Sequence, residues 1–361
     1  MRSITIETPR GQRIIGPEQP VFIVAELSGN HNGDLGRARA LVDAAVETGA
    51  DAIKLQTYTA ETMTIDCNNE YFQVGVSKAW KGHTLYSLYE LASTPWEWQP
   101  GLKAQAEARG VPLFSSPFDG AAVDFLEHMG VPMHKVASLE IGDIALLRKI
   151  GSTQKPVIMS RGMASVEEIE LALTTLKQAG APGVALLHCV SSYPASPEEM
   201  NLRTIPDLAR RFDIIPGLSD HTLGTAVAVA SVALGACVIE KHFTLRRADG
   251  GPDAAFSLEP EEFALMVKEV REVSAALGKP SYEPSPKESE TKAYRRSVFV
   301  VKDIEAGGVL TSENVRVIRP GHGLAPKYLD SIMGRPVTLA LSRGTPLRPE
   351  HVAGFSPESR A

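Results

Sequence analysis

One pattern recurs eight times between Val21 and Gly278. A short run of apolar and β-branched residues is followed by a segment of helical periodicity that usually ends in glycine. Strands that alternate with helices predict parallel pairing, and eight such units in about 250 residues are typical of a (β/α)8 barrel. We therefore expect an α/β fold, a TIM barrel. The expected strands are Val21–Leu27, Ala52–Tyr58, Pro112–Phe118, His134–Ser138, Val157–Ser160, Val184–Cys189, Ile214–Ser219 and Val238–Phe243.

An open, doubly wound sheet is the alternative for the same alternation. No Gly-x-Gly-x-x-Gly motif follows the first expected strand, which disfavours a dinucleotide-binding fold. Capping-box spacing at Thr94–Glu97, Ser165–Glu168 and Ser196–Glu199 predicts where three helices begin. The expected helices include Asp34–Thr48, Ala121–His128, Val166–Gln178, Leu202–Arg211, Thr225–Leu234 and Pro260–Leu277.

Two segments interrupt or follow this pattern. Glu61–Ser93 is a long insertion after the second strand, expected either to cover the active-site face or to be a structural excursion. At Tyr282–Lys292 the composition changes to Glu, Pro, Ser and Lys, which is typical of an exposed linker. Beyond it, Ile304–Val315 aligns with Leu341–Val352 as an internal near-repeat. The expected organisation is a barrel domain at 1–280, a linker at 281–294, a small β-rich domain at 295–352 and a flexible tail at 353–361.

Charge and cysteine content exclude several classes of function. The chain has 37 Lys+Arg against 43 Asp+Glu, so no basic excess favours nucleic acid or an anionic membrane surface as a partner. The longest apolar run, Ala226–Ile239, is shorter than the ~20 residues that span a bilayer. Met1–Gly11 lacks the apolar segment of a signal peptide. Cys67, Cys189 and Cys237 show no Cys-x-x-Cys spacing, so we expect a cytoplasmic protein without disulfides.

The expected strand ends are all polar, and in such barrels the C-terminal strand ends carry the chemistry. His221 and His242 end neighbouring strands, so their imidazoles can converge on a divalent ion with open coordination positions. Asp220 can orient His221 or cap its loop. The alternative is that each histidine is a hydrogen-bonded residue of the core or rim.

Buried ammonium groups are costly unless they meet anions, and two inward-facing strands carry Lys54 and Lys135. With three serines at neighbouring strand ends, they can bind a phosphate and a carboxylate. The serines are Ser116, Ser138 and Ser160. Alternatively, the lysines pair internally with Glu26 or Glu240. Glu26 is itself a candidate base for water or a neighbour of the metal, unless it merely pairs with Lys54.

Four motifs resemble those of the sialic acid synthase family, whose members are phosphoenolpyruvate-dependent nonulosonate synthases. They are Ala25–Gly33, Lys54–Thr59, Gly217–His221 and Glu240–Phe243. Arg319–Leu324 resembles the antifreeze-like (SAF) domain of that family. The similarity covers nearly the whole chain and keeps the order of the motifs. It implies a TIM barrel followed by a small, β-rich SAF domain.

Within the family, several stretches are most similar to the pseudaminic acid synthases. They are Glu26–Ser28, Gln56–Thr59, Leu85–Glu90, Thr94–Trp98 and Phe114–Phe118. N-acetylneuraminate and legionaminate synthases are the alternative. They typically have an Ile or Ala-Gly-type sequence after the first Glu, and Phe rather than Tyr after Gln-Thr.

The resemblance implies a reaction and its parts. Phosphoenolpyruvate would condense with 2,4-diacetamido-2,4,6-trideoxy-L-altrose and water, giving pseudaminic acid and phosphate through C–O cleavage, with Mn2+ or Mg2+. Catalytic positions are matched by Glu26, His221 and His242, the two histidines as metal ligands. The phosphoenolpyruvate site is matched by Lys54, Ser116, Lys135, Ser138 and Ser160. Sugar-binding positions are matched by Gln56, Tyr193, Asp253 and Arg319. The family organisation implies a homodimer in which the SAF domain caps the partner's active site and brings Arg319 to it.

Two residues depart from the family pattern. Arg161 stands where a Thr is common after Ser160, and Ser191 replaces an Asn that binds sugar in N-acetylneuraminate synthases. Two other functions stay open. One is a carbohydrate-binding protein with an inert barrel, and the other is a metal-dependent aldolase that acts on pyruvate.

Overall fold

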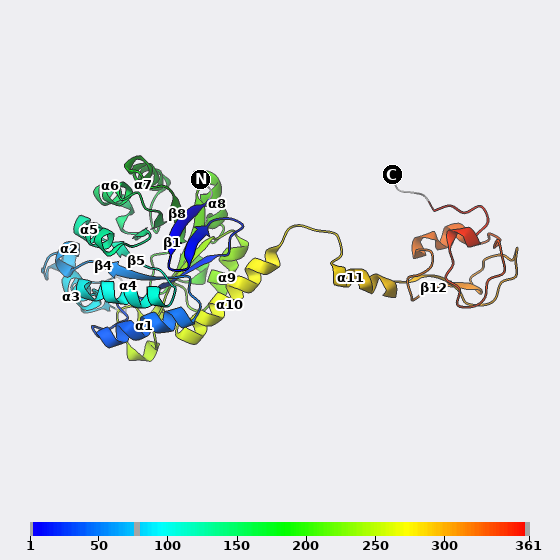
Figure 1. Cartoon of the computed structure of the whole chain (residues 1–361), viewed down its shortest axis with the longest axis horizontal. Helices are drawn as coiled ribbons and strands as arrows, with labels where there is room; N and C mark the ends of the chain where they lie inside the picture. Colours follow the sequence, from blue (N-terminus) through cyan, green and yellow to red (C-terminus); the bar gives the residue numbers. More distant parts are fainter. Residues whose placement is uncertain (1–2, 76–79, 358–361) are drawn as a thin grey trace. The chain divides into compact units, whose positions relative to one another are not determined.

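The structure is a computed structural model that describes residues 3–75 and 80–357. The chain forms two compact units, Met1–Gly278 and Lys279–Ala361 (Figure 1). In the described part of the chain, no helix is both long and apolar enough to cross a bilayer.

Eight parallel strands form a closed barrel in the first unit, with the order β10-β3-β4-β5-β6-β7-β8-β9. Because β10 pairs with β3, the sheet has no free edge, and the predicted TIM barrel is confirmed over the open sheet. Each expected strand overlaps one observed strand. The strands are β3 (Phe22–Glu26), β4 (Ala52–Thr57), β5 (Leu113–Pro117), β6 (His134–Val136), β7 (Val157–Ser160), β8 (Val184–Cys189), β9 (Ile215–Asp220) and β10 (Val238–His242).

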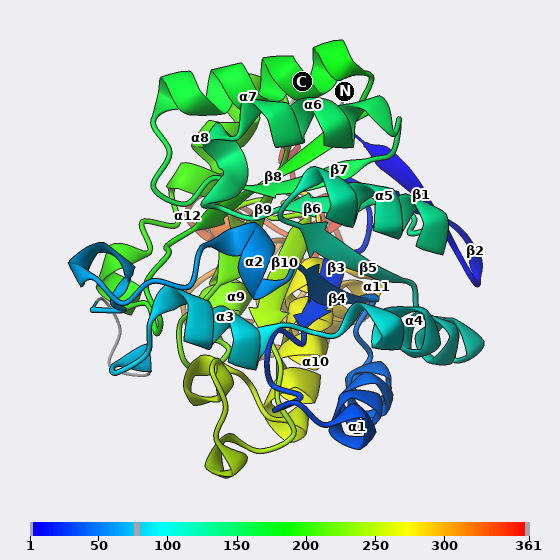
Figure 2. The same cartoon turned by 90° about the vertical axis from the view of Figure 1, so that its left-hand side faces the viewer.

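The barrel helices lie around the strands (Figure 2). They are α1 (Leu35–Glu47), α4 (Gln99–Ala108), α5 (Gly120–Met129), α6 (Ile144–Ser152), α7 (Val166–Ala179), α8 (Thr204–Phe212), α9 (Ala226–Ala233) and α10 (Pro260–Leu277). The capping box predicted at Ser165 is confirmed at the start of α7.

The other two capping predictions were wrong in their contacts. Short 3-10 turns do begin after Thr94 and Ser196, but neither hydroxyl caps a backbone N–H. The Thr94 hydroxyl instead meets the imidazole of His31 at 3.1 Å, and the Ser196 hydroxyl donates to Glu198. Tertiary and side-chain partners therefore outcompeted the local cap.

An N-terminal hairpin, β1 (Ile4–Thr8) and β2 (Gly11–Ile15), precedes the barrel and was not predicted. Its buried side chains Ile4, Ile6 and Ile15 join the apolar cluster inside the barrel. That cluster also contains the side chains nearest the N-terminal ends of the strands, among them Phe22, Ala52, Phe114, Ile158 and Val238. The hairpin therefore closes the N-terminal end of the barrel with apolar contacts.

The second unit is built on a two-stranded antiparallel sheet, β11 (Ser297–Val300) and β12 (Val315–Ile318), with the short helix α12 (Leu329–Ile332). The near-repeat has a structural meaning, because Ile304 and Leu341, its equivalent positions, exchange backbone hydrogen bonds of 2.9 and 2.8 Å. The segment expected as a linker contains a short exposed helix, α11 (Pro286–Thr291), capped by Ser285 and Glu288. Of the expected tail, residues 358–361 lie outside the described residues.

Candidate active site

The C-terminal ends of the barrel strands bring most of the predicted site residues together. Those on or directly after strands are Glu26 (β3), Lys54 and Gln56 (β4), Ser116 (β5), Lys135 and Ser138 (β6), Ser160 (β7), His221 (β9) and His242 (β10). Tyr193 lies in the loop after β8, and Asp253 lies in the loop after β10. Arg319 is exposed on the second unit, and its role at this site stays a prediction.

Lys54 lies at the centre of a buried charge cluster. Its Nζ is 2.7 Å from Glu26 Oε2, 3.4 Å from Glu240 Oε1 and 3.3 Å from Ser116 Oγ. Burial lowers the pKa of Lys54, but the carboxylates of Glu240 and Glu26 outweigh burial and raise it overall. Burial raises the pKa of Glu26, with Lys54 acting against it. The internal pairing considered for Lys54 is therefore present, and anion binding stays a prediction.

Lys135 joins the same cluster from β6. Its Nζ donates to Ser160 Oγ at 2.8 Å and to the Val136 carbonyl at 3.1 Å, and it lies 3.8 Å from Glu240 Oε1. Burial lowers the pKa of Lys135, while Glu240 acts against it. Glu240 is thus shared by two lysines. From the sequence, Glu240 was considered only as an alternative partner with which these lysines could pair. The sequence did contain a signal for this role. Glu240 lies two residues before His242, and this spacing puts both side chains on the inner face of the barrel.

A chain of hydrogen bonds leads from the charge cluster to Asp253. Gln56 Nε2 donates to Glu26 Oε1 at 3.0 Å and to Ser28 Oγ at 3.1 Å. Ser28 in turn donates to Asp253 Oδ2. Burial raises the pKa of Asp253, and the bond from Ser28 acts against it. The two predicted sugar-side residues, Gln56 and Asp253, are therefore linked through Ser28, which was not predicted as a site residue.

The two histidines converge as predicted, with ring centroids 5.3 Å apart. His221 Nδ1–H donates to the Val190 carbonyl at 2.9 Å, so Nε2 is the nitrogen that would bind a metal when the ring is neutral. Among the described residues, His242 Nδ1 is buried without a hydrogen-bond partner, and burial holds the pKa of His242 well below its usual range. Burial lowers the pKa of His221, but Cys189, the Val190 carbonyl and Asp220 together outweigh burial and raise it.

These features fit a divalent ion held by two imidazoles with open positions for water and substrate. Among residues 3–75 and 80–357, no group of three or more His, Cys, Asp or Glu side chains is arranged to hold a metal. The identity of the metal and its binding stay predictions.

Asp220 acts on the loop of His221 rather than on its imidazole. Lys241 Nζ donates to Asp220 Oδ2 and to the Thr222 carbonyl, both at 2.6 Å. Asp220 Oδ1 accepts bonds from the Thr222 amide and hydroxyl. The residues on both sides of His221 are therefore fastened to the residue that precedes His242.

Aromatic side chains from three loops surround the histidines. The Tyr193 ring lies 4.4 Å from that of His221, 5.1 Å from Phe256 and 5.4 Å from Trp80. Trp80 Nε1 also donates to the Pro252 carbonyl at 2.7 Å. The insertion thus packs on loops at the C-terminal face, where Figure 2 shows its helices α2 (Ala60–Met63) and α3 (Leu85–Ala92). No sequence signal indicated Phe256.

The two departures from the family pattern have different surroundings. Arg161 Nη2 and Nε donate to His188 Nδ1 at 3.0 and 3.2 Å, so the guanidinium pairs outside the lysine cluster. Ser191 Oγ lies 2.9 Å from Ser138 Oγ. Arg161 therefore leaves the hydrogen bond between Lys135 and Ser160 intact.

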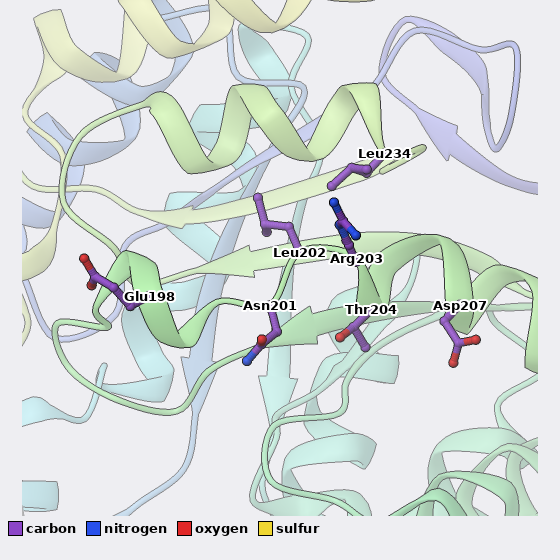
Figure 3. A pocket seen from close by; sticks show the side chains of 7 residues that line it. All are labelled: Glu198, Asn201, Leu202, Arg203, Thr204, Asp207 and Leu234. Carbon is purple, nitrogen blue, oxygen red and sulfur yellow. The ribbon is translucent and has the colours of Figure 1, made fainter.

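A separate surface hollow of about 720 Å³ lies beside α8 (Figure 3). It contains none of the predicted site residues. Its lining residues are Glu198, Asn201, Leu202, Arg203, Thr204, Asp207 and Leu234. We therefore assign the chemistry to the strand ends.

Comparison with known proteins identifies the family. Residues 41–282 match the NeuB family, and residues 295–353 match the SAF domain. This chain belongs to the NeuB family. The predicted membership of the sialic acid synthase family, the barrel with a SAF domain and the enzyme class are thereby confirmed.

Named relatives resemble this NeuB-family chain over nearly its full length. It is 40% identical over 335 residues to the pseudaminic acid synthase of Helicobacter pylori, covering 92% of this chain and 98% of that protein. It is 37% identical over 342 residues to the N,N'-diacetyllegionaminic acid synthase of Legionella pneumophila, covering 93% and 96%. The crystal structure of an N-acetylneuraminic acid synthetase from Leptospira borgpetersenii has a TM-score of 0.71 and 34% identity, covering 80% of this chain and 95% of that one.

Proposed function

We propose that this NeuB-family enzyme condenses phosphoenolpyruvate with 2,4-diacetamido-2,4,6-trideoxy-L-altrose and water. The products are pseudaminic acid and inorganic phosphate. The observation that carries the proposal is the buried cluster in which Lys54 and Lys135 share Glu240. Glu240 lies on β10, two residues before His242. Relatives of about 40% identity named pseudaminic acid synthase support the choice of sugar.

The charge cluster suits a small, multiply charged anion. Lys54, Lys135, Glu26 and Glu240 sum formally to zero, so both ammonium groups are held in place without an unpaired buried charge. Phosphate and carboxylate oxygens of phosphoenolpyruvate would compete with these carboxylates for the lysines. Three hydroxyls of neighbouring strand ends would add donors to the same oxygens. They belong to Ser116, Ser138 and Ser160.

Glu26 changes role when the anion arrives. Once Lys54 turns toward phosphoenolpyruvate, Glu26 loses the cation that opposes the effect of burial on its pKa. It then accepts a proton more readily and serves as the base for water. The enol carbon of phosphoenolpyruvate bonds to the aldehyde carbon of the sugar, whose oxygen becomes an alkoxide. Water adds to C2 while Glu26 takes one of its protons, and Glu26 then passes that proton to the alkoxide, which becomes a hydroxyl group. The carbon–oxygen bond then breaks, and the bridging oxygen leaves with phosphate. The remaining proton on the C2 hydroxyl leaves with phosphate as the keto group forms.

His221 and His242 would hold Mn2+ or Mg2+, which supplies Lewis acidity to the sugar aldehyde when bound. Around them, the rings of Tyr193, Phe256 and Trp80 form an apolar wall that suits the C6 methyl group of a 6-deoxy sugar. Gln56 and Asp253 provide polar groups on the sugar side. We further propose a homodimer in which Arg319 of the SAF domain reaches the partner's site.

An activity panel tests the substrate. Phosphate release from phosphoenolpyruvate is measured with the diacetamido altrose, with the diacetamido hexose precursor of legionaminate and with N-acetylmannosamine. The first should have the highest kcat/KM, and pyruvate in place of phosphoenolpyruvate should give no product. Equal kcat/KM for N-acetylmannosamine would favour an N-acetylneuraminate synthase. A preference for the legionaminate precursor would favour that alternative, which a relative of 37% identity supports.

A further inference from the structure

Ser28 has a backbone conformation that serine rarely adopts. Its φ is 47°, in the left-handed region that glycine occupies without a steric penalty. Its side chain is also buried at the C-terminal end of β3, with 2% of the residue exposed. A side chain kept at a strained position beside a site indicates that the side chain itself has a use.

The hydroxyl of Ser28 makes two hydrogen bonds whose directions are determined by their partners. Gln56 Nε2 can only donate, so Ser28 Oγ accepts that bond at 3.1 Å. The single hydroxyl proton therefore goes to Asp253 Oδ2. The backbone amide of Gly29 also acts to lower the pKa of this carboxyl group, against the effect of burial. Ser28 thus holds Asp253 from one side.

The orientation of the Gln56 amide follows from the same bonds. Both N–H groups of Gln56 Nε2 are used within the protein, one toward Glu26 Oε1 and one toward Ser28 Oγ. In the described part of the chain, Gln56 Oε1 has no hydrogen-bond partner. The partly exposed Gln56 therefore offers a free acceptor, suited to the N–H of an acetamido group.

We propose that Ser28 is a positioning residue that determines sugar specificity by orienting Gln56 Oε1 and Asp253 toward an acetamido hexose, an inference that rests on the proposed function. Without the hydroxyl, the Gln56 amide loses one of the two acceptors that distinguish its nitrogen from its oxygen. The acceptor for the acetamido N–H would then be oriented for only part of the time, which weakens sugar binding.

Two substitutions separate the hydroxyl from the backbone strain. Ser28→Ala and Ser28→Gly both remove the hydroxyl, and only glycine relieves the strain at φ 47°. Gln154→Gly is the matched control, because exposed Gln154 has a φ of 57° and precedes β7 at the opposite end of the barrel. KM and kcat for both substrates, calorimetric Kd for the diacetamido altrose and the melting temperature are measured for each variant.

Both Ser28 variants should raise the KM and Kd for the sugar by about tenfold, the effect of one lost hydrogen bond of about 1.4 kcal/mol. The KM for phosphoenolpyruvate should stay within about twofold. Ser28→Gly should melt at a higher temperature than Ser28→Ala, and Gln154→Gly should leave both KM values unchanged.

The result that overturns the inference is a sugar KM and Kd in Ser28→Ala equal to those of the wild type. A parallel rise in both KM values with a lower melting temperature also overturns it, because a merely structural serine would behave so. If the wild type binds the sugar but releases no phosphate, the proposed reaction fails, while the Kd comparison still decides the role of Ser28. If the wild type does not bind the sugar at all, both fail.

Discussion

Lys241 and Asp220 form an ion pair in which neither side chain is exposed, with Nζ 2.6 Å from Oδ2. The pair joins β10 to the end of β9, directly beside the two histidines. The additional bond from Lys241 Nζ to the Thr222 carbonyl makes it a clamp around His221. We infer that this clamp, more than the strand spacing alone, maintains the separation of the two imidazoles.

Lys241→Met should destabilise the barrel by about 3–5 kcal/mol, because it leaves the Asp220 carboxylate buried without its cation. It should also weaken Mn2+ binding, measured by calorimetry alongside chemical unfolding. Lys268→Met is the matched control, since Lys268 forms an exposed pair with Glu272 worth less than about 1 kcal/mol. Equal stability and metal affinity in the two variants would refute the clamp.

Replacing both His221 and His242 by alanine should abolish calorimetric Mn2+ binding, because the two imidazoles are the proposed protein ligands. Chelation should likewise stop phosphate release by the wild type, and added Mn2+ should restore it. His128→Ala, which removes an exposed histidine on α5, serves as the control. Retained Mn2+ affinity in the double variant would contradict the assignment.

Stability should fall as the pH falls from about 6.5 toward 4, in part because of His31. Burial, with Arg37 nearby, lowers the pKa of His31 from 6.5 to about 4. Between these values the unfolded chain binds a proton that the folded protein does not, so acid favours unfolding by up to roughly 3 kcal/mol. Unfolding free energies across this range should vary less with pH in His31→Gln than in the wild type. An unchanged pH dependence would show that His31 takes up its proton in the folded state.

Phosphoenolpyruvate labelled with 18O in its bridging oxygen should transfer the label to inorganic phosphate. This outcome follows from water attack at C2 and breakage of the carbon–oxygen bond. Mass spectrometry of both products measures it. Label that stays in the keto acid would indicate phosphorus–oxygen cleavage and exclude the proposed steps.

Arg319 can be tested by mixing subunits. Arg319→Ala and Glu26→Ala should each be inactive alone, whereas mixed dimers should regain part of the activity. In a mixed dimer one site carries both lesions and the other carries none, if Arg319 serves the partner's barrel. Subunit exchange is verified by mass spectrometry of the mixed dimers. Exchange without recovery would show that Arg319 acts within its own chain or not at all.

The sequence predicted the barrel and the position of most candidate site residues at its strand ends, because both depend on local periodicity. Alternation along β4 placed Lys54 and Gln56 on one face, and the position of each strand end placed His221 beside His242. Non-local contacts were not predictable in the same way. Glu240 meets Lys54 only because the barrel closes β10 against β3.

The positions of residues in loops were harder to predict from the sequence. Phe256 and Ser28 owe their positions to loop packing and to a left-handed backbone, neither of which leaves a periodic signal. Thr94 was predicted to cap a helix from its local sequence, but its hydroxyl bonds to the distant His31 instead. The N-terminal hairpin was not predicted, because Ile4 and Ile6 have a surface to cover only once the barrel has formed.

The N-terminal end of the barrel is closed, because apolar side chains fill its interior and the hairpin packs on them. Ile4, Ile6 and Ile15 add a further apolar layer at that end, so we expect both substrates to reach the lysine cluster from the C-terminal end of the barrel. A single entrance imposes an order on substrate binding and product release. If phosphoenolpyruvate binds at the lysine cluster, beneath the aromatic loops, it must bind before the sugar. Phosphate formed at the same place would then be released only after the keto acid has left. We therefore expect sequential, ordered steady-state kinetics, in which phosphoenolpyruvate binds first and phosphate leaves last.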